Sequence, residues 1–174
     1  IRDSAHITEI EGQRREQTLR EHSENVAKYA SEKLRGIKLY HTAYLAGLLH
    51  DMGKGSRKYQ DYLARAACGE PVVRGSVNHT FCGVIYLFKY YHFGKTPGME
   101  TITCELLAFA VGSHHGLFDC VSPKNESGFE HRTDADLQDI EYEEAVSRFL
   151  AECTGEGEIN LSLIHISEPT RHSL

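Results

Sequence analysis

An adjacent histidine and aspartate, His50 and Asp51, are the residues of this sequence whose types and position most favour chemistry. They end the apolar run of the segment LLHDMGK, residues 48–54. Burial of an apolar helix would bring both polar side chains to its end, where each needs a partner. A metal ion satisfies both, because imidazole nitrogen and carboxylate oxygen are common ligands. A hydrogen-bonded structural pair is the alternative that these two residues alone leave open.

Further histidines occur at positions that suit the same site. His114 and His115 stand in the segment GSHHG, His79 in VNHT, and His22 on the inner face of the first expected helix. Adjacent imidazoles on a helix point about 100° apart, so both can face one site only at a helix end or in a loop. Any one of these histidines could be a satisfied core residue. Together, five histidines and one aspartate on successive helices predict a shared metal site.

About six helices should position these residues. Thr18 and Glu21 fit the capping box that begins a helix. Apolar spacing and glycine stops predict four helices over residues 18–34, 56–67, 100–113 and 134–153. A further helix should end near residues 50–51, and another should run from Asn78, as its N-cap, to residue 88. No alternating run is long enough to predict a strand. The sequence therefore predicts an all-α fold, a compact helical bundle.

Composition limits the class of protein. The 174 residues are 40% hydrophobic, enough for one domain with one core. The net charge is −6, but residues 130–158 hold ten acidic and two basic residues, so the rest of the chain carries +2. We expect five reduced cysteines, since no CxxC pair is present. Without a leader or a long apolar run, we expect a cytoplasmic protein with no membrane partner.

The two ends of the sequence do not match the rest. Both ends look like translated adaptor sequence: IRDS at residues 1–4 and LSLIHISEPTR at residues 161–171. We therefore expect the domain to cover residues 5–160, to be truncated near Asn160, and to be followed by a non-native tail over residues 161–174.

Aromatic and basic side chains also have two interpretations. Aromatic residues recur at helical spacing, which favours core and rim packing, with a base-stacking groove as the alternative: Tyr59, Tyr62, Phe81, Tyr86, Tyr90 and Tyr91. Basic residues of the third expected helix could follow a phosphate backbone, although a solvated face is the simpler interpretation: Arg57, Lys58 and Arg65.

The histidine pattern resembles the HD superfamily of metal-dependent phosphohydrolases. Within it, the sequence is most similar to the CRISPR-associated HD nuclease of the type I interference helicase-nuclease, and to its subtype I-C branch. The segments that carry the resemblance are EH at 21–22, LAGLLHDMGK at 45–54, YQ at 59–60, VNH at 77–79 and SHHGLFD at 113–119. The resemblance spans residues 18–119 and implies a compact HD-domain bundle.

The resemblance also implies roles for matching residues. A first ion would be held by His22, His50 and Asp51, and a second by Asp51, His79, His114 and His115. Asp51, His50 and Lys54 would be catalytic, with Lys54 near the scissile phosphate. Two divalent ions about 3.5–4 Å apart can activate water and stabilise a leaving oxygen. The many imidazoles favour Mn, Fe, Co or Ni over Mg.

One part of the family pattern is missing. The family completes the first metal site with an aspartate on a late helix. The late aspartates here come too soon and in an acidic surface pattern, so none matches: Asp134, Asp136 and Asp139. We therefore expect the first metal site to be weak.

The resemblance implies an endonuclease that hydrolyses single-stranded DNA. Its partners would be an interference helicase, on the same or a separate chain, and a guide-RNA surveillance complex. No phosphate-binding loop of the GxxxxGK[ST] type is present for ATP. The alternatives are a phosphohydrolase that acts on small nucleotides and a truncated, non-catalytic docking module.

Overall fold

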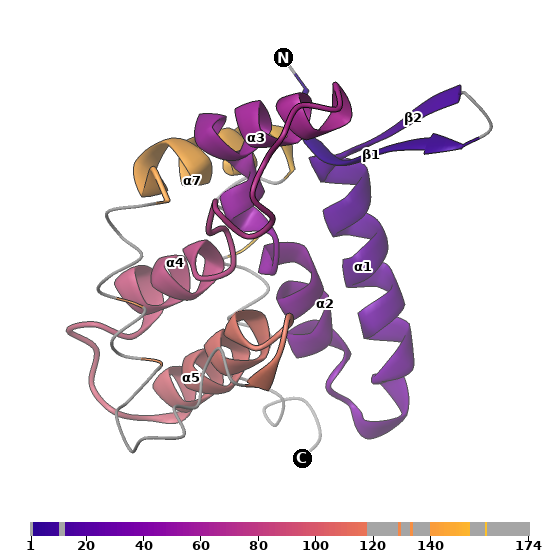
Figure 1. Cartoon of the computed structure of the whole chain (residues 1–174). Coiled ribbons are helices and arrows are strands. Elements are labelled where there is room, and N and C mark those ends of the chain that lie inside the picture. The colour runs from indigo at the N-terminus through magenta and orange to yellow at the C-terminus, as the bar shows by residue number, and fades with distance from the viewer. Residues whose placement is uncertain are drawn as a thin grey trace.

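The computed structural model describes residues 2–10, 13–117, 129, 133, 140–153 and 159. Its α-helices are α1 Leu19–Lys33, α2 Tyr40–Leu49, α3 Arg57–Ala67, α4 Cys82–Tyr91, α5 Met99–Gly112 and α7 Tyr142–Glu152 (Figure 1). Two short 3-10 helices, Arg35–Ile37 and Met52–Gly55, follow α1 and α2. One hairpin of strands β1 Ser4–Ile10 and β2 Gln13–Thr18 precedes α1. The predicted helical fold class is confirmed.

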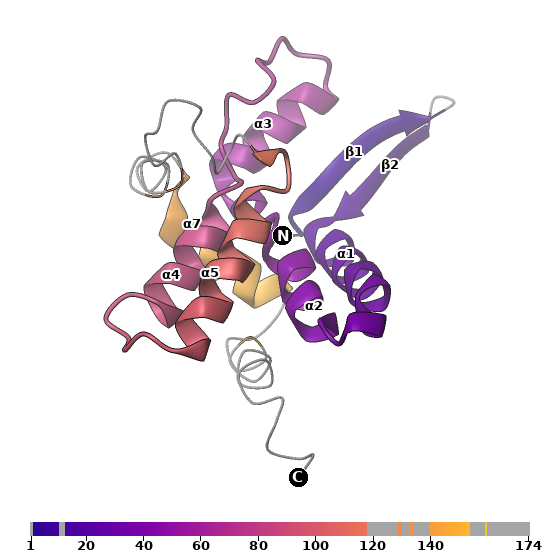
Figure 2. The same cartoon turned by 90° about the horizontal axis from the view of Figure 1, so that it is seen from below.

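Helices α1 and α2 lie side by side and are packed closely (Figures 1 and 2). A Cβ atom at Gly47 would lie 2.7 Å from the Ala27 Cα atom, so a larger residue would separate the helices. The core formed by α2, α4, α5 and α7 buries large side chains, among them Leu49, Phe81, Tyr86, Leu107 and Phe149. This packing fixes the ends of α2 and α5, where the histidines are.

The predicted helix starts and ends are confirmed where local signals determine them. The Thr18 hydroxyl accepts a hydrogen bond from the Glu21 backbone N–H, and the Glu21 carboxylate accepts one from the Thr18 N–H, both at 3.2 Å. The Ser56 hydroxyl caps α3. Helix α2 ends at Leu49 with His50 as its C-cap. Helix α5 begins at Met99, one residue before its predicted start.

The hairpin contradicts the prediction that the chain has no strand. Strands β1 and β2 pair antiparallel (Figure 2). In this register His6 lies opposite Gln17. The sequence of β2, QRREQT, is polar and mostly exposed, so it lacks the alternation that identifies a half-buried strand. Contacts at the base of the hairpin stabilise it instead, and those contacts come from distant parts of the chain.

Asp3 and Ser4, which we expected to lie outside the domain, are buried in it. The Asp3 carboxylate forms an ion pair with the Arg148 guanidinium of α7. The Asp3 backbone carbonyl accepts a hydrogen bond from the Leu19 N–H at 2.7 Å. Asp3 therefore attaches the hairpin to α1 and α7. Residues 161–174 lie outside the described residues.

Two helices begin later than predicted. Asn78 does not cap α4: its side-chain oxygen accepts a hydrogen bond from the Thr80 N–H, and the helix begins four residues later at Cys82. Helix α7 begins at Tyr142 because Glu141 has a left-handed backbone with φ 53°. The earlier part of that prediction, residues 134–139, lies outside the described residues. Within the described ranges, no helix is long and apolar enough to cross a membrane.

Candidate metal centre

The Asp51 carboxylate lies at the middle of the histidine cluster and is 2% exposed. Its Oδ2 atom lies 2.9 Å from His22 Nε2, 3.0 Å from His50 Nε2 and 2.8 Å from Lys54 Nζ. The two imidazole nitrogens are 3.2 Å apart. One oxygen of Asp51 therefore faces two imidazoles and one ammonium group.

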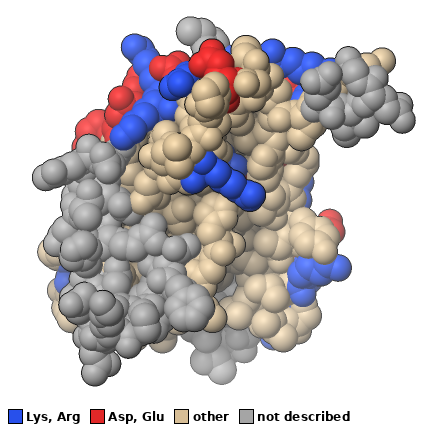
Figure 3. Space-filling view, in the orientation of Figure 1, with Lys and Arg blue, Asp and Glu red and all other residues tan. Residues whose placement is uncertain are grey.

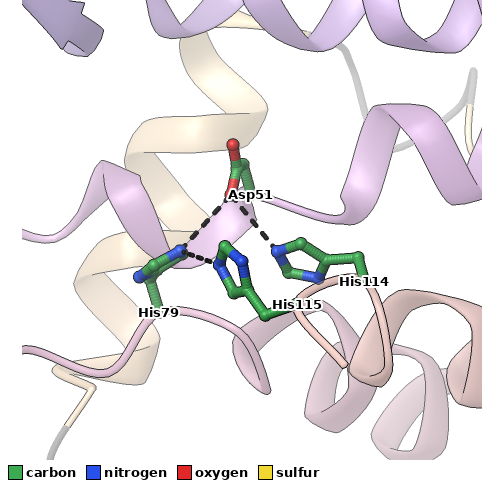
Figure 4. Close-up of side chains that lie close together, drawn as sticks. All are labelled: Asp51, His79, His114 and His115. Atoms are coloured by element: carbon green, nitrogen blue, oxygen red, sulfur yellow. Dashed lines mark hydrogen bonds and ion pairs between the residues drawn. The ribbon is translucent and has the colours of Figure 1, made fainter. Parts of the chain in front are cut away.

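The other oxygen of Asp51 faces a second set of imidazoles (Figure 4). Asp51 Oδ1 lies 3.5 Å from His79 Nε2 and 3.6 Å from His114 Nε2. His79 Nε2 is in turn 3.1 Å from His115 Nε2. These four residues offer ligand atoms that all lie within 4.8 Å of one another. The structure thus brings together all six residues predicted to hold metal, on two sides of one carboxylate.

The six residues come from four parts of the fold. His22 lies on α1, His50 is the C-cap of α2, and Asp51 is the next residue. His79 lies in the turn before α4, and His114 and His115 lie in the turn after α5. The two adjacent histidines can face one site because they follow the helix end, as predicted.

Backbone carbonyls fix the protonation of two imidazoles. His50 Nδ1 lies 2.7 Å from the Gly47 carbonyl oxygen, and His114 Nδ1 lies 2.6 Å from that of Val111. A carbonyl oxygen only accepts hydrogen bonds, so both Nδ1 atoms carry the proton. In the neutral rings the Nε2 lone pairs of His50 and His114 point toward Asp51 and are available as metal ligands.

The donor set fits a divalent cation. Asp51 Oδ1 and His114 Nε2 are buried and make no hydrogen bond with any residue that the structure describes. His50 Nε2 and Asp51 Oδ2 lie 3.0 Å apart. Ligand atoms that share one ion at ~2.0–2.2 Å lie about 3–3.6 Å apart. A bound cation would therefore satisfy these atoms with small movements.

The ionisation states also suit a cation. Burial raises the pKa of Asp51, but the imidazoles of His114, His22 and His50 lower it more, so its pKa is held well below the ordinary value. Burial lowers the pKa of His79 to about 4, so its ring is neutral at pH 7. An ionised carboxylate and neutral imidazoles are the forms that bind metal.

Lys54, expected near the scissile phosphate, is buried and is 4% exposed. Its ammonium group pairs with Asp51 Oδ2 and lies 5.7 Å from the centre of the Tyr59 ring. It also lines a cavity of about 520 Å³ beside the cluster. The Lys54 side chain thus contacts the Asp51 carboxylate and also lines this cavity.

Further aromatic and polar side chains line the same cavity. Its lining includes Tyr59, Tyr62, Arg74 and Asn78, together with His79 of the cluster. Figure 3 shows basic side chains in the middle of this face of the molecule and acidic ones at its upper edge. Of the other aromatic residues, Phe81 and Tyr86 are core residues, as the simpler interpretation predicted. Of the basic residues on α3, Arg57 and Arg65 form surface ion pairs.

Sequence reasoning missed two residues of the site. His6 of β1 lies against His22, with ring centroids 4.7 Å apart, and Arg74 lies in the loop after α3. Without a predicted strand, nothing in the sequence placed His6 near Asp51. Four aspartates lie outside the described residues: Asp119 of the SHHGLFD segment, and Asp134, Asp136 and Asp139, which do not match the late family ligand.

The sequence has no significant match among curated proteins. The family model for the HD domain matches residues 19–152, which is well over half of the chain. This match covers α1 to α7 and all six residues of the cluster, and proteins of this family are typically metal-dependent phosphohydrolases. The chain therefore belongs to the HD domain family.

Proposed function

We propose that this protein is a metal-dependent endonuclease that hydrolyses single-stranded DNA in CRISPR type I interference. The observation that carries the proposal is the buried Asp51 carboxylate, whose two oxygens face separate sets of imidazoles. A carboxylate shared between two ligand sets is what a two-metal phosphodiesterase requires.

The residues have distinct parts in such a reaction. His22, His50 and Asp51 would hold one ion, and Asp51, His79, His114 and His115 the other. When bound, the ions supply Lewis acidity that makes water a stronger nucleophile and stabilises the leaving oxygen. Lys54 presents its ammonium group to the cavity, where it would attract a phosphate and orient it toward Asp51. The imidazole-rich set favours Mn, Fe, Co or Ni.

The shape of the surface favours a polymer substrate. A second cavity of about 480 Å³ shares His6 with the first and continues along the hairpin to Arg15. The linings of the two cavities meet at His6, so a chain longer than one nucleotide could contact both. Lys54 and Arg74 supply positive charge to the first cavity, whereas Arg15 of the second lies beside Glu16 and Glu21. The half-buried ring of Tyr62 could stack on a base.

A phosphohydrolase of small nucleotides is the second candidate. The first cavity alone, at about 520 Å³, lies within the ~300–1,000 Å³ typical of small-molecule sites. Tyr59, Tyr62 and Asn78 could hold one base in it.

The CRISPR role rests on the resemblance of the segment SHHGLFD, residues 113–119. On that basis we propose that an interference helicase, on the same or a separate chain, delivers the displaced DNA strand, and that a guide-RNA complex selects it in the cytoplasm. A docking module without catalysis would have no need for His79, His114 and His115 to converge on Asp51.

The test is manganese-dependent cleavage of circular single-stranded DNA. Wild-type protein should linearise the circle, Asp51→Ala should not, and Asp61→Ala, an exposed aspartate on α3, should match wild type. Parallel assays with deoxynucleoside triphosphates and cyclic nucleotides identify the second candidate. Cleavage that survives Asp51→Ala would refute the proposed mechanism, and metal analysis showing no bound ion would favour the docking module.

A further inference from the structure

His6 of β1 stands beside the Oδ2 side of the metal centre. A ring nitrogen of His6, one of His22 and a carboxylate oxygen of Asp51 all lie within 4.8 Å of one another. The His6 and His22 rings meet edge to face at an interplanar angle of 80°. His6 also lines both cavities next to the centre. An additional nitrogen donor is therefore present on this side, and it comes from a strand.

The backbone that carries His6 is held in place by the rest of the fold. The Gln60 side chain of α3 accepts a hydrogen bond from the Ser4 N–H and donates one to the Ser4 carbonyl, each at 2.9 Å. The same Gln60 amide donates to the Lys54 carbonyl at 2.7 Å. Ala5, next to His6, is completely buried. Gln60 thus ties the His6 strand directly to the segment that contains Asp51.

The two sides of Asp51 differ by one imidazole if His6 is left out. Among the described residues, the Oδ1 side has His79, His114 and His115, whereas His22 and His50 contact Oδ2; the group that contains His6 consists of His6, His22 and Asp51. Transition-metal ions with imidazole and carboxylate ligands take four or more donors. We infer that His6 is the third imidazole ligand of the ion on the Oδ2 side. This inference rests on the metal-binding part of the proposed function.

The competing explanation is that His6 only packs against the His22 ring. Packing requires a flat ring but no nitrogen, whereas coordination requires the nitrogen lone pair. His6→Phe keeps the ring and removes the nitrogen, and His6→Ala removes both. Thr8→Ala is the matched control, because Thr8 is exposed on the same face of β1, two residues further along.

The experiment is Mn²⁺ titration of the whole chain by calorimetry, with electron paramagnetic resonance to detect nitrogen coupling to Mn²⁺. We expect two ions in wild type and in Thr8→Ala. Both His6 variants should bind one ion at least tenfold more weakly, with weaker nitrogen coupling and an unchanged second ion. Circular dichroism checks folding, and His6→Phe decides the question if His6→Ala is unstable.

Other results would overturn the inference. If His6→Phe binds both ions within twofold of wild type, His6 is a packing residue and the metal centre itself stands. If wild type binds no Mn²⁺, the inference fails together with the proposed function.

Discussion

Gly53→Ala tests whether the turn after Asp51 positions the ligand His79. A Cβ atom at residue 53 would lie 2.3 Å from the His79 carbonyl oxygen and 2.7 Å from its Cα atom. Real Cβ contacts are essentially never shorter than 3.0 Å, so the two backbones must separate by at least ~0.7 Å. Metal–ligand distances tolerate only about ±0.2 Å. The substitution should therefore move His79 out of coordination range of an ion on Asp51 Oδ1.

The expected loss is about 10–100-fold in affinity for one Mn²⁺ ion, the range found when a residue that orients a ligand is changed. The metal-free protein should lose about 1–3 kcal/mol of unfolding free energy, since an added methyl group forces the backbone to shift. Calorimetric Mn²⁺ titration measures the first quantity, and urea denaturation with chelator measures the second.

Gly36→Ala is the control, because a Cβ atom there meets nothing within 4 Å and the residue has no left-handed backbone. It should bind both ions as wild type does. If Gly53→Ala also binds both ions within twofold of wild type, the contact with His79 does not position the ligand, and the reasoning from the close approach is wrong.

Two further predictions concern stability. Asp3→Ala should lower the unfolding free energy by about 3 kcal/mol in urea denaturation, because it leaves the Arg148 charge without its buried partner. Arg14→Ala on the exposed hairpin should change the unfolding free energy by less than about 0.5 kcal/mol. Equal effects of the two substitutions would contradict the anchoring role of Asp3. The pKa of His79 is lowered to about 4 from 6.5, so between these values the unfolded chain binds a proton that the folded protein does not. The metal-free protein should therefore lose stability as the pH falls through this window, by roughly 3 kcal/mol in total, and His79→Gln should remove that part of the pH dependence in denaturation curves measured from pH 7 to 4.

Local signals in the sequence were sufficient for much of the site. The capping box at Thr18 and the glycine stop after Asp51 depend on residues a few positions apart, and the structure confirms both helix boundaries. The paired histidines, His114 and His115, follow α5 because the helix ends where its apolar pattern ends. Ligands at the ends of predictable helices could thus be identified before the fold was known.

Contacts between distant residues explain what the sequence did not predict. The hairpin depends on Asp3 meeting Arg148 and on Ser4 meeting Gln60, and no periodicity within residues 4–18 indicates either contact. The late start of α4 has a similar cause. The turn before it must bring the His79 backbone against Gly53, which is incompatible with a helix beginning at Asn78.

The two sides of Asp51 are unequal before any ion binds. On the Oδ2 side the Lys54 ammonium group already neutralises the carboxylate, so an ion there must share the oxygen with a positive charge. On the Oδ1 side, the carboxylate oxygen and His114 Nε2 are buried without a hydrogen bond from the described part of the chain, so an ion there relieves a desolvation penalty. Substitutions at Gly53 and at His6 act on opposite sides of this asymmetry, and they therefore separate the contribution of each ion to one shared carboxylate.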